Sequence, residues 1–367
     1  MKLFKHLLVA PAVLGLIAPV TANATESDLE AISNLYQENI DLNVKSFKSN
    51  IDNKSLLLSG GEGLVESSAD ESSIDENSFS ETTSASFGST FYVGAVENSA
   101  TGEATTFSYD FGMDLSTSFT GEDSLDIAVI GGNANVTAVD GFMGGDGTSD
   151  TLELDGVSYT FPLGGATVIV GDGVGVDDLN TGACAYSAFT DLLSDCGTSN
   201  VGGSADSAFA IAYDFDNGFT LAGGAGGGTG TDGFFTEQDA STIGLEAAYT
   251  ADTYGVSVAY TDDEATTYWS VQAMLAPEGY PSLSVGYETD DDDADAIFAG
   301  LTFAEVGPGS VSLGMASTDL SSDDYYQYEL AYSYPLNDGM TITPGIFIKE
   351  TSGDDETGVV VTTSFSF

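Results

Sequence analysis

The sequence contains no arginine and few basic residues of any kind. Its 367 residues include six lysines and one histidine, His6, against 58 aspartates and glutamates, which gives a formal net charge of -52. A surface this acidic repels phosphate, so nucleic acid is excluded as a partner. Beyond His6 no imidazole is present, so neither Ser-His-Asp nor Cys-His catalysis can be assembled in the rest of the chain. We expect no enzymatic activity, no catalytic residues, no metal site and no cofactor.

Long apolar runs are absent after the N-terminal stretch. Lys2 and Lys5 precede a short apolar segment, residues 7–20, and residues 22–24 form an Ala-Asn-Ala cleavage site. This order predicts a secretory signal peptide over residues 1–24. A transmembrane anchor is the alternative, but the segment is shorter than the roughly 20 residues that a bilayer requires.

Residues 25–83 differ from the rest of the chain in composition. Asp28 to Asn39 could form a short helix, and Ser59 to Thr83 is rich in serine, glutamate and aspartate, as linkers are. We expect residues 25–83 to form a periplasmic segment that ends in an acidic linker.

From Ser84 onward, apolar and polar residues alternate, which indicates strands with two different faces. One face of such a run carries Phe107, Tyr109, Phe111, Met113 and Leu115, and the other carries Ser108, Asp110, Gly112, Asp114 and Ser116. Counting these runs gives about sixteen strands, an even number within the range of bacterial outer-membrane barrels. The sequence predicts an all-β fold, a transmembrane antiparallel β-barrel over residues 84–367, preceded by the short helical and linker segment.

The connections between these strands fall into two alternating classes. One class is short and rich in turn residues: 120–123, 162–165, 214–218, 250–253, 277–281, 305–309 and 335–339. The other is longer or more acidic: 133–150, 172–206, 226–239, 262–264, 290–293 and 319–324. Short periplasmic turns and longer external loops are typical of outer-membrane barrels. A soluble two-sheet sandwich is the alternative, although its loops need not segregate in this way.

Acidic residues occupy positions that alternation assigns to the barrel interior. About sixteen strands enclose a lumen too wide for side chains to fill, so these residues are expected to line an aqueous pore. Carboxylates around a channel attract cations and repel anions. The predicted pore-lining residues are Asp110, Asp114, Asp126, Glu153, Asp155, Glu246 and Glu329, together with the single barrel lysine, Lys349.

The longest connection, residues 172–206, has the position and length of a loop that folds inward and narrows a barrel. Its predicted constriction residues are Asp172, Asp177, Asp178 and Asp191. The segment also contains the only two cysteines, Cys184 and Cys196, for which we expect a disulfide in an oxidising compartment. A pair of free thiols is the alternative, and without a nearby histidine a zinc site is not expected.

Several short motifs together carry a resemblance to a known family. They are the strand at 87–91, Phe-Ser-Tyr-Asp at 107–110 leading to Thr-Ser-Phe-Thr-Gly at 117–121, Phe-Pro-Leu-Gly at 161–164, Tyr-Ser-Ala-Phe at 186–189, and the ending from Ile342 to Phe367. In these motifs the chain resembles cyanobacterial outer-membrane porins of the OprB-type carbohydrate-selective family. Residues 25–83 are too short for the complete S-layer-homology domain that such porins carry.

The resemblance implies passive diffusion of sugars, ions or other small hydrophilic solutes through each barrel of a homotrimer in the cell outer membrane. Its partners would be outer-membrane lipid, lipopolysaccharide and those solutes. Residues 170–179 lack the pore-facing arginines common in the family, so we expect a passage that favours cations. A surface structural or adhesive β-protein without a conducting pore is the alternative, and a barrel enzyme is a further one.

Overall fold

The chain is described from a computed structural model covering residues 83–99, 102–134, 137–145, 147–202, 207–227, 241–291, 294–317 and 325–367. The predicted signal peptide and short helix lie outside these residues, as does the predicted linker apart from Thr83, which begins the first strand.

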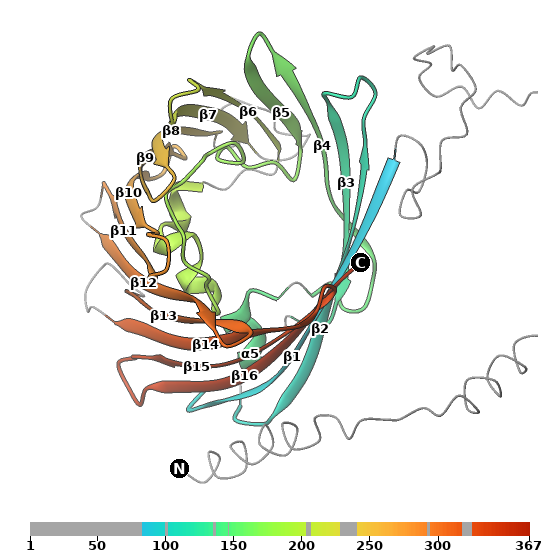
Figure 1. Cartoon of the computed structure of the whole chain (residues 1–367). Coiled ribbons are helices and arrows are strands. Elements are labelled where there is room, and N and C mark those ends of the chain that lie inside the picture. Colours follow the sequence, from blue (N-terminus) through green and yellow to red (C-terminus); the bar gives the residue numbers. More distant parts are fainter. Residues whose placement is uncertain are drawn as a thin grey trace, which may run out of the picture. The chain divides into compact units, whose positions relative to one another are not determined.

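Within the described residues, sixteen antiparallel strands form one closed barrel, in which each strand pairs with its sequence neighbours and β1 pairs with β16 (Figure 1). The strands are β1 (Thr83–Glu97), β2 (Thr106–Thr117), β3 (Ser124–Gly132), β4 (Glu153–Leu163), β5 (Ala166–Asp172), β6 (Ser207–Asp214), β7 (Phe219–Gly227), β8 (Ser241–Ala251), β9 (Tyr254–Asp262), β10 (Thr267–Leu275), β11 (Ser282–Asp290), β12 (Asp295–Val306), β13 (Gly309–Ser317), β14 (Tyr326–Asn337), β15 (Met340–Lys349) and β16 (Glu356–Ser366). The predicted fold class is confirmed, and the sandwich alternative is wrong because no strand edge is left open.

Alternation along each strand separates an apolar outer face from a small or polar inner face. On β8, Ile243 and Leu245 are exposed on the outside of the barrel. Gly244 and Glu246 face inward and are buried under the connection between β5 and β6. Residues paired across antiparallel strands share a face, so this assignment passes from strand to strand. The exposed outer residues include Trp269, Val271, Leu313, Leu330 and Ile346.

The barrel closes where the first strand meets the last. Phe87 and Phe367 exchange two backbone hydrogen bonds, with N to O distances of 2.8 and 3.0 Å, and their rings stack 5.6 Å apart. Phe91 packs edge-to-face on Phe365 on the same outer surface. The aromatic C-terminal residue therefore belongs to the seam that completes the barrel.

The connections fall into the two predicted classes, one at each end of the barrel. We call the end with the short connections, such as those between β4 and β5 and between β8 and β9, the turn end. We call the opposite end, with the longer or more acidic connections, the loop end. Among the described residues, two loop-end connections contain helices: α5 (Ala138–Met143) lies between β3 and β4, and the 3₁₀ helices η1 (Asp191–Gly197) and η2 (Ser199–Gly202) lie between β5 and β6.

Both helical connections fold into the barrel and supply its buried clusters (Figure 1). Val139 of α5 packs with Val96, Phe347 and Val360 on the inner wall. Leu193 of η1 packs with Phe298 and Ala316. No helix in the described part of the chain is long and apolar enough to cross a membrane.

Candidate functional site

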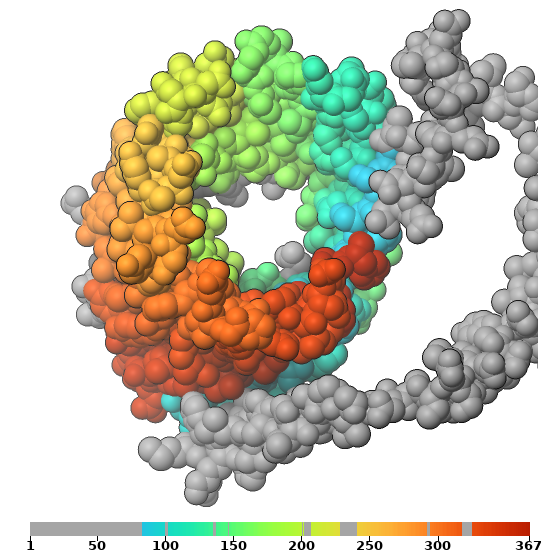
Figure 2. All heavy atoms as spheres, viewed as in Figure 1, coloured from blue at the N-terminus to red at the C-terminus, as the bar shows by residue number. Residues whose placement is uncertain are grey.

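The candidate site is the passage left between the barrel wall and the connections folded inside it. Figure 2 shows an opening through the barrel, bordered on one side by the yellow-green connection between β5 and β6. We call residues 173–202 of this connection the inner loop. It lies along the inner faces of the strands from β6 to β15, so it narrows the barrel without filling it (Figure 1).

Inward-facing glycines provide the surface on which the inner loop rests. Gly224 and Gly244 are register partners on β7 and β8, and Val176 lies directly against both. A Cβ on Gly286 would lie 2.0 Å from the carbonyl oxygen of Cys196. Glycine within a strand commonly marks such a close approach of backbone.

Aromatic side chains of the loop use further glycines in the same way. The ring of Tyr186 lies where Gly300 and Gly314, also register partners, would carry their Cβ atoms. Phe189 packs in the same manner on Gly345 of β15. The path of the inner loop therefore depends on the inward-facing glycines of the wall as much as on the residues of the loop itself.

Glutamates on the wall hold the backbone of the inner loop. Glu329 on β14 accepts four hydrogen bonds: from the Tyr186 hydroxyl at 2.7 Å, from the amides of Phe189 and Thr190 at 2.8 Å each, and from the Thr190 hydroxyl at 2.5 Å. Because a carboxylate accepts such bonds strongly, Glu329 acts as an anchor for the loop. Burial and this carboxylate raise the pKa of Tyr186, so its hydroxyl remains a donor.

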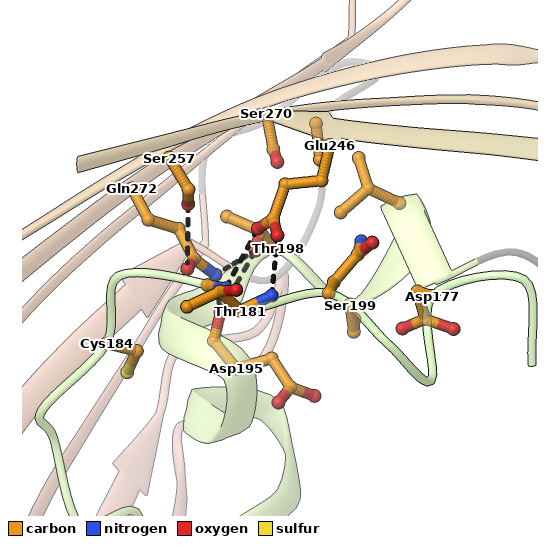
Figure 3. A pocket seen from close by; sticks show the side chains of 14 residues that line it. Asp177, Thr181, Cys184, Asp195, Thr198, Ser199, Glu246, Ser257, Ser270 and Gln272 are labelled. Carbon is orange, nitrogen blue, oxygen red and sulfur yellow. Dashed lines mark hydrogen bonds between the residues drawn. The ribbon is translucent and has the colours of Figure 1, made fainter. Parts of the chain in front are cut away.

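A second anchor lies on the strands from β8 to β10 (Figure 3). Glu246 accepts hydrogen bonds from the amides of Thr181 at 2.6 Å and Gly182 at 2.9 Å. Gln272 accepts from the Ala183 amide at 2.8 Å and donates to the Asp195 carbonyl at 2.7 Å. The backbone groups of the loop that face the wall are thus satisfied by wall side chains, as buried polar groups require.

A disulfide joins Cys184 to Cys196 within the inner loop, with an S–S distance of 1.99 Å. Cys196 is fully buried beside Leu193 and Phe298. Asp195 and Cys196 both have positive φ angles, 49° and 52°, a conformation that few residues other than glycine adopt. The cross-link closes a short ring and fixes this turn against the wall.

The connection that contains α5 covers a different arc of the wall. Asp140 and Thr137 cap the helix reciprocally, and Asp140 also accepts a hydrogen bond from Ser108 of β2. The rings of Phe142 and Phe347 pack at a tilt of 34° with their centroids 4.3 Å apart, and the Nζ atom of Lys349 lies 5.6 Å from the centroid of the Phe142 ring. The predicted pore-lining lysine thus faces the interior and contacts an aromatic ring there.

Four of the predicted acidic residues lie on the inward rows of β2, β3 and β4. Asp110 accepts from the Thr90 amide at 3.0 Å and from the Tyr92 hydroxyl, Asp114 is exposed, and Asp126 accepts from Ser124 at 2.7 Å. Glu153 pairs with Ile130, which shares the inward row with Asp126. The main contacts of α5 are with β1, and those of η1 are with β11, β12 and β13.

Asp155 and Asp172 differ from the sequence interpretation. The register between β3 and β4 shifts at Asp155, which has no cross-strand partner, so alternation does not assign it to the inward row. Asp172 is the last residue of β5 rather than part of the loop. It pairs with Val157 of the outward row, where its carboxylate accepts a hydrogen bond from Ser207 at 2.9 Å.

Glu246 and Glu329 point inward as predicted, but the inner loop covers them, and they are 6% and 2% exposed. They anchor the loop and do not contact the open passage directly, because their oxygens are occupied by loop donors. The other predicted constriction residues lie on the loop: Asp177 is half-buried, whereas Asp178 and Asp191 are exposed.

Asp177 is set apart from these residues by its environment. Burial raises its pKa to about 6, and the nearby carboxylates of Asp178, Asp195 and Glu246 act in the same direction. This acid therefore changes charge near neutral pH, where an ordinary aspartate remains ionised.

Sequence reasoning missed the wall residues that receive the loop. Gln272, Glu288 and Gln327 are nearly fully buried, and each contacts the inner loop through its polar group. A usable signal was present in the inward rows of β7 to β15, where glycine recurs. In the described residues, no group of three or more Asp, Glu, Cys or His side chains could hold a metal ion directly.

Comparisons with known proteins identify similar solved structures but no similar sequence family. No family model matches the sequence, and no curated protein matches it. OprB of Pseudomonas putida, in a high-pH structure, matches with a TM-score of 0.60 and 13% identity over 78% of this chain and 94% of that chain. A loop-deletion mutant of OmpT, an outer membrane protein of Vibrio cholerae, matches with a TM-score of 0.59 and 12% identity over 78% and 100%.

A mutant of the Rh. blastica porin matches with a TM-score of 0.54 and 14% identity, over 78% of this chain and 100% of that chain. At these identities the likeness shows a shared fold, the closed β-barrel already described.

Proposed function

We propose that this chain is an outer-membrane porin through which small hydrophilic solutes, sugars and ions, diffuse passively. The observation that carries the proposal is a closed barrel with an apolar outer face and an opening that its inner loop narrows (Figure 2). In hydrocarbon every backbone polar group must be paired within the protein, and closed barrels meet that condition. The fold shared with OprB and the Rh. blastica porin supports the same function.

The charge of the passage supports a preference for cations. Asp114, Asp126 and Asp191 lie on the inner wall or on the inner loop, and Lys349 is the only basic residue of the sequence after Lys54. Carboxylates along a pore concentrate cations and exclude anions. Their effect decreases with salt, since the Debye length is about 8 Å near 0.15 M.

An uncharged part of the wall supports passage of neutral sugars. A cavity of about 220 Å³ beside Phe189 is lined by hydroxyl groups on the strands from β13 to β16. They belong to Ser310, Ser312, Ser333, Thr343, Thr362 and Ser364. Hydroxyls both donate and accept hydrogen bonds, as sugars do, so they replace the water that a sugar loses in a narrow passage.

In this function the turn end faces the periplasm and the loop end faces the exterior. The barrel lies in outer-membrane lipid and lipopolysaccharide, and the resemblance to carbohydrate-selective porins favours a homotrimer. Residues 1–24 would direct secretion, and residues 25–83 would lie in the periplasm.

Recording in a planar bilayer under a KCl gradient tests this function. We expect stepwise conductance with a reversal potential of cation-selective sign, and swelling of protein-containing liposomes in small sugars. The variant Asp114→Asn should reduce the reversal potential, whereas Asp338→Asn in an exposed turn should change it less. Absence of conductance would favour the adhesive alternative, and an anion-selective sign would refute the acidic passage.

A further inference from the structure

A partly open cavity lies between the inner loop and the inner wall (Figure 3). Its volume is about 280 Å³, and it is lined by β8, β9 and β10 on one side and by loop residues on the other. Three carboxylates line it: Asp177 and Asp195 from the loop and Glu246 from the wall. No basic residue is among its lining residues.

The hydrogen-bond donors around this cavity are largely engaged already. The amides of Thr181 and Gly182 donate to Glu246, and the Gln272 side-chain amide donates to the Asp195 carbonyl and to Thr198. The groups of the lining that remain available to an occupant are therefore mainly negatively charged carboxylates and other acceptor oxygens. An occupant that complements these groups brings positive charge and donors of its own.

Ser270 provides a second and independent observation. This residue of β10 is 3% exposed, and its hydroxyl is directed into the cavity (Figure 3). Its hydroxyl forms no hydrogen bond with the described residues, and it is open to the cavity rather than fully enclosed. A polar occupant of the cavity would therefore supply the partner that the protein does not.

The spacing of the carboxylates limits the kind of cation. Among the described residues, no three or more acidic, cysteine or histidine side chains lie close enough together to coordinate a bare metal ion. A larger cation that carries N–H or O–H donors suits the separation better. Organic ammonium ions have this character, and so does Mg²⁺, which usually keeps several of its waters.

We propose that this cavity binds one small cation that carries hydrogen-bond donors, an organic ammonium or a hydrated metal ion, held by Asp177, Asp195, Glu246 and Ser270. The site lies beside the passage and is formed only when the inner loop is seated on the wall. It is thus a specific binding site, distinct from the diffuse attraction of cations by an acidic pore.

Titration calorimetry on the folded full chain in detergent tests the proposal, with MgCl₂ and putrescine as separate probes at constant ionic strength. We expect saturable binding of at least one probe, with one ion per chain. Binding of Mg²⁺ alone identifies a hydrated metal ion, and binding of putrescine alone identifies an organic ammonium.

Matched variants separate the site from the general charge of the protein. Asp195→Asn should weaken binding about tenfold, because it removes one nearby charge while asparagine tolerates the same positive φ. Asp177→Asn should have a similar effect and serves as a second, independent variant. Asp191→Asn removes the same charge from an exposed position of the inner loop that does not line the cavity, and binding should stay within about twofold.

Two results would overturn the proposal: no saturable binding of either probe, or an equal loss of affinity in Asp191→Asn. Heat-modifiable migration on gels confirms that each variant is folded. The measurement involves no current, so a protein that conducts without binding would refute this site and leave the porin function standing.

Discussion

Gly224 on β7 and Val176 on the inner loop are in direct backbone contact. A Cβ on Gly224 would lie 2.3 Å from the Val176 carbonyl oxygen, closer than any side chain tolerates. Gly244, its register partner on β8, leaves room for the Val176 side chain itself. The first part of the inner loop therefore rests on two adjacent glycines, and its distance from the wall is set by them.

Replacement of Gly224 by alanine should displace the inner loop. An added methyl group in a well-packed contact costs about 1–3 kcal/mol. We expect faster amide exchange in residues 174–182, measured by hydrogen–deuterium exchange and mass spectrometry, and an altered single-channel conductance. Gly223→Ala is the control, because its methyl group would face outward and meet the flexible end of Leu245. Equal effects in the two variants would contradict the assigned contact.

Glu329→Gln should loosen the second part of the loop. Glutamine keeps the size of the side chain, but its amide nitrogen cannot accept the bonds that Thr190 donates. Each hydrogen bond to a charged group contributes about 1.5–3 kcal/mol to stability, and that contribution is lost when the donor is left unpaired. Amide exchange at Phe189 and Thr190 should accelerate at least tenfold, while exchange at Thr181, held by Glu246, should change little. Unchanged exchange at Thr190 would show that Glu329 is not its anchor.

The selectivity of the passage should depend on pH near neutrality. Asp177 has a raised pKa of about 6, so it is ionised above that pH and neutral below it. Lowering the pH from about 7.5 to about 5 should therefore reduce the cation-selective reversal potential, while ordinary carboxylates remain charged. In Asp177→Asn this pH-dependent part should disappear. A wild-type potential that is constant over this interval would argue against the assignment.

Asp123 should stabilise the turn between β2 and β3 except in acid. Its carboxylate accepts bonds from the Thr120 amide at 2.8 Å, the Phe119 amide at 2.9 Å and the Tyr159 hydroxyl at 2.6 Å. These bonds hold the pKa of Asp123 well below its usual range, so the ionised form is favoured in the folded protein.

Because this folded-state pKa is depressed, the stabilisation is present above the unfolded value of about 4 and is lost as the pH falls through the folded one. Asp123→Asn should lower the midpoint of urea unfolding at neutral pH, and the gap to wild type should narrow below about pH 4. Glu122→Gln, an exposed neighbour in the same turn, should leave the midpoint unchanged. A gap that stays constant with pH would contradict the role of the carboxylate.

The sequence was sufficient to predict the barrel. Alternation such as Phe107, Tyr109 and Phe111 against Ser108 and Asp110 depends on the two-residue period of a strand, which is a local property. The two classes of connection are local as well. Together they predicted the strand number, the ends of the barrel and the segment that folds inward.

The tertiary structure alone decided what the inward residues do. Glu246, Glu329 and Asp114 all carry a carboxylate on the inner face of the barrel. The inner loop covers Glu246 and Glu329, whereas Asp114 is exposed. The bulge at Asp155 and the position of Asp172 at a strand end depend likewise on pairing with distant residues. Alternation specifies which face a side chain occupies, but what covers that face is set by contacts between residues far apart in the chain, such as Tyr186 and Glu329, which are 143 positions apart.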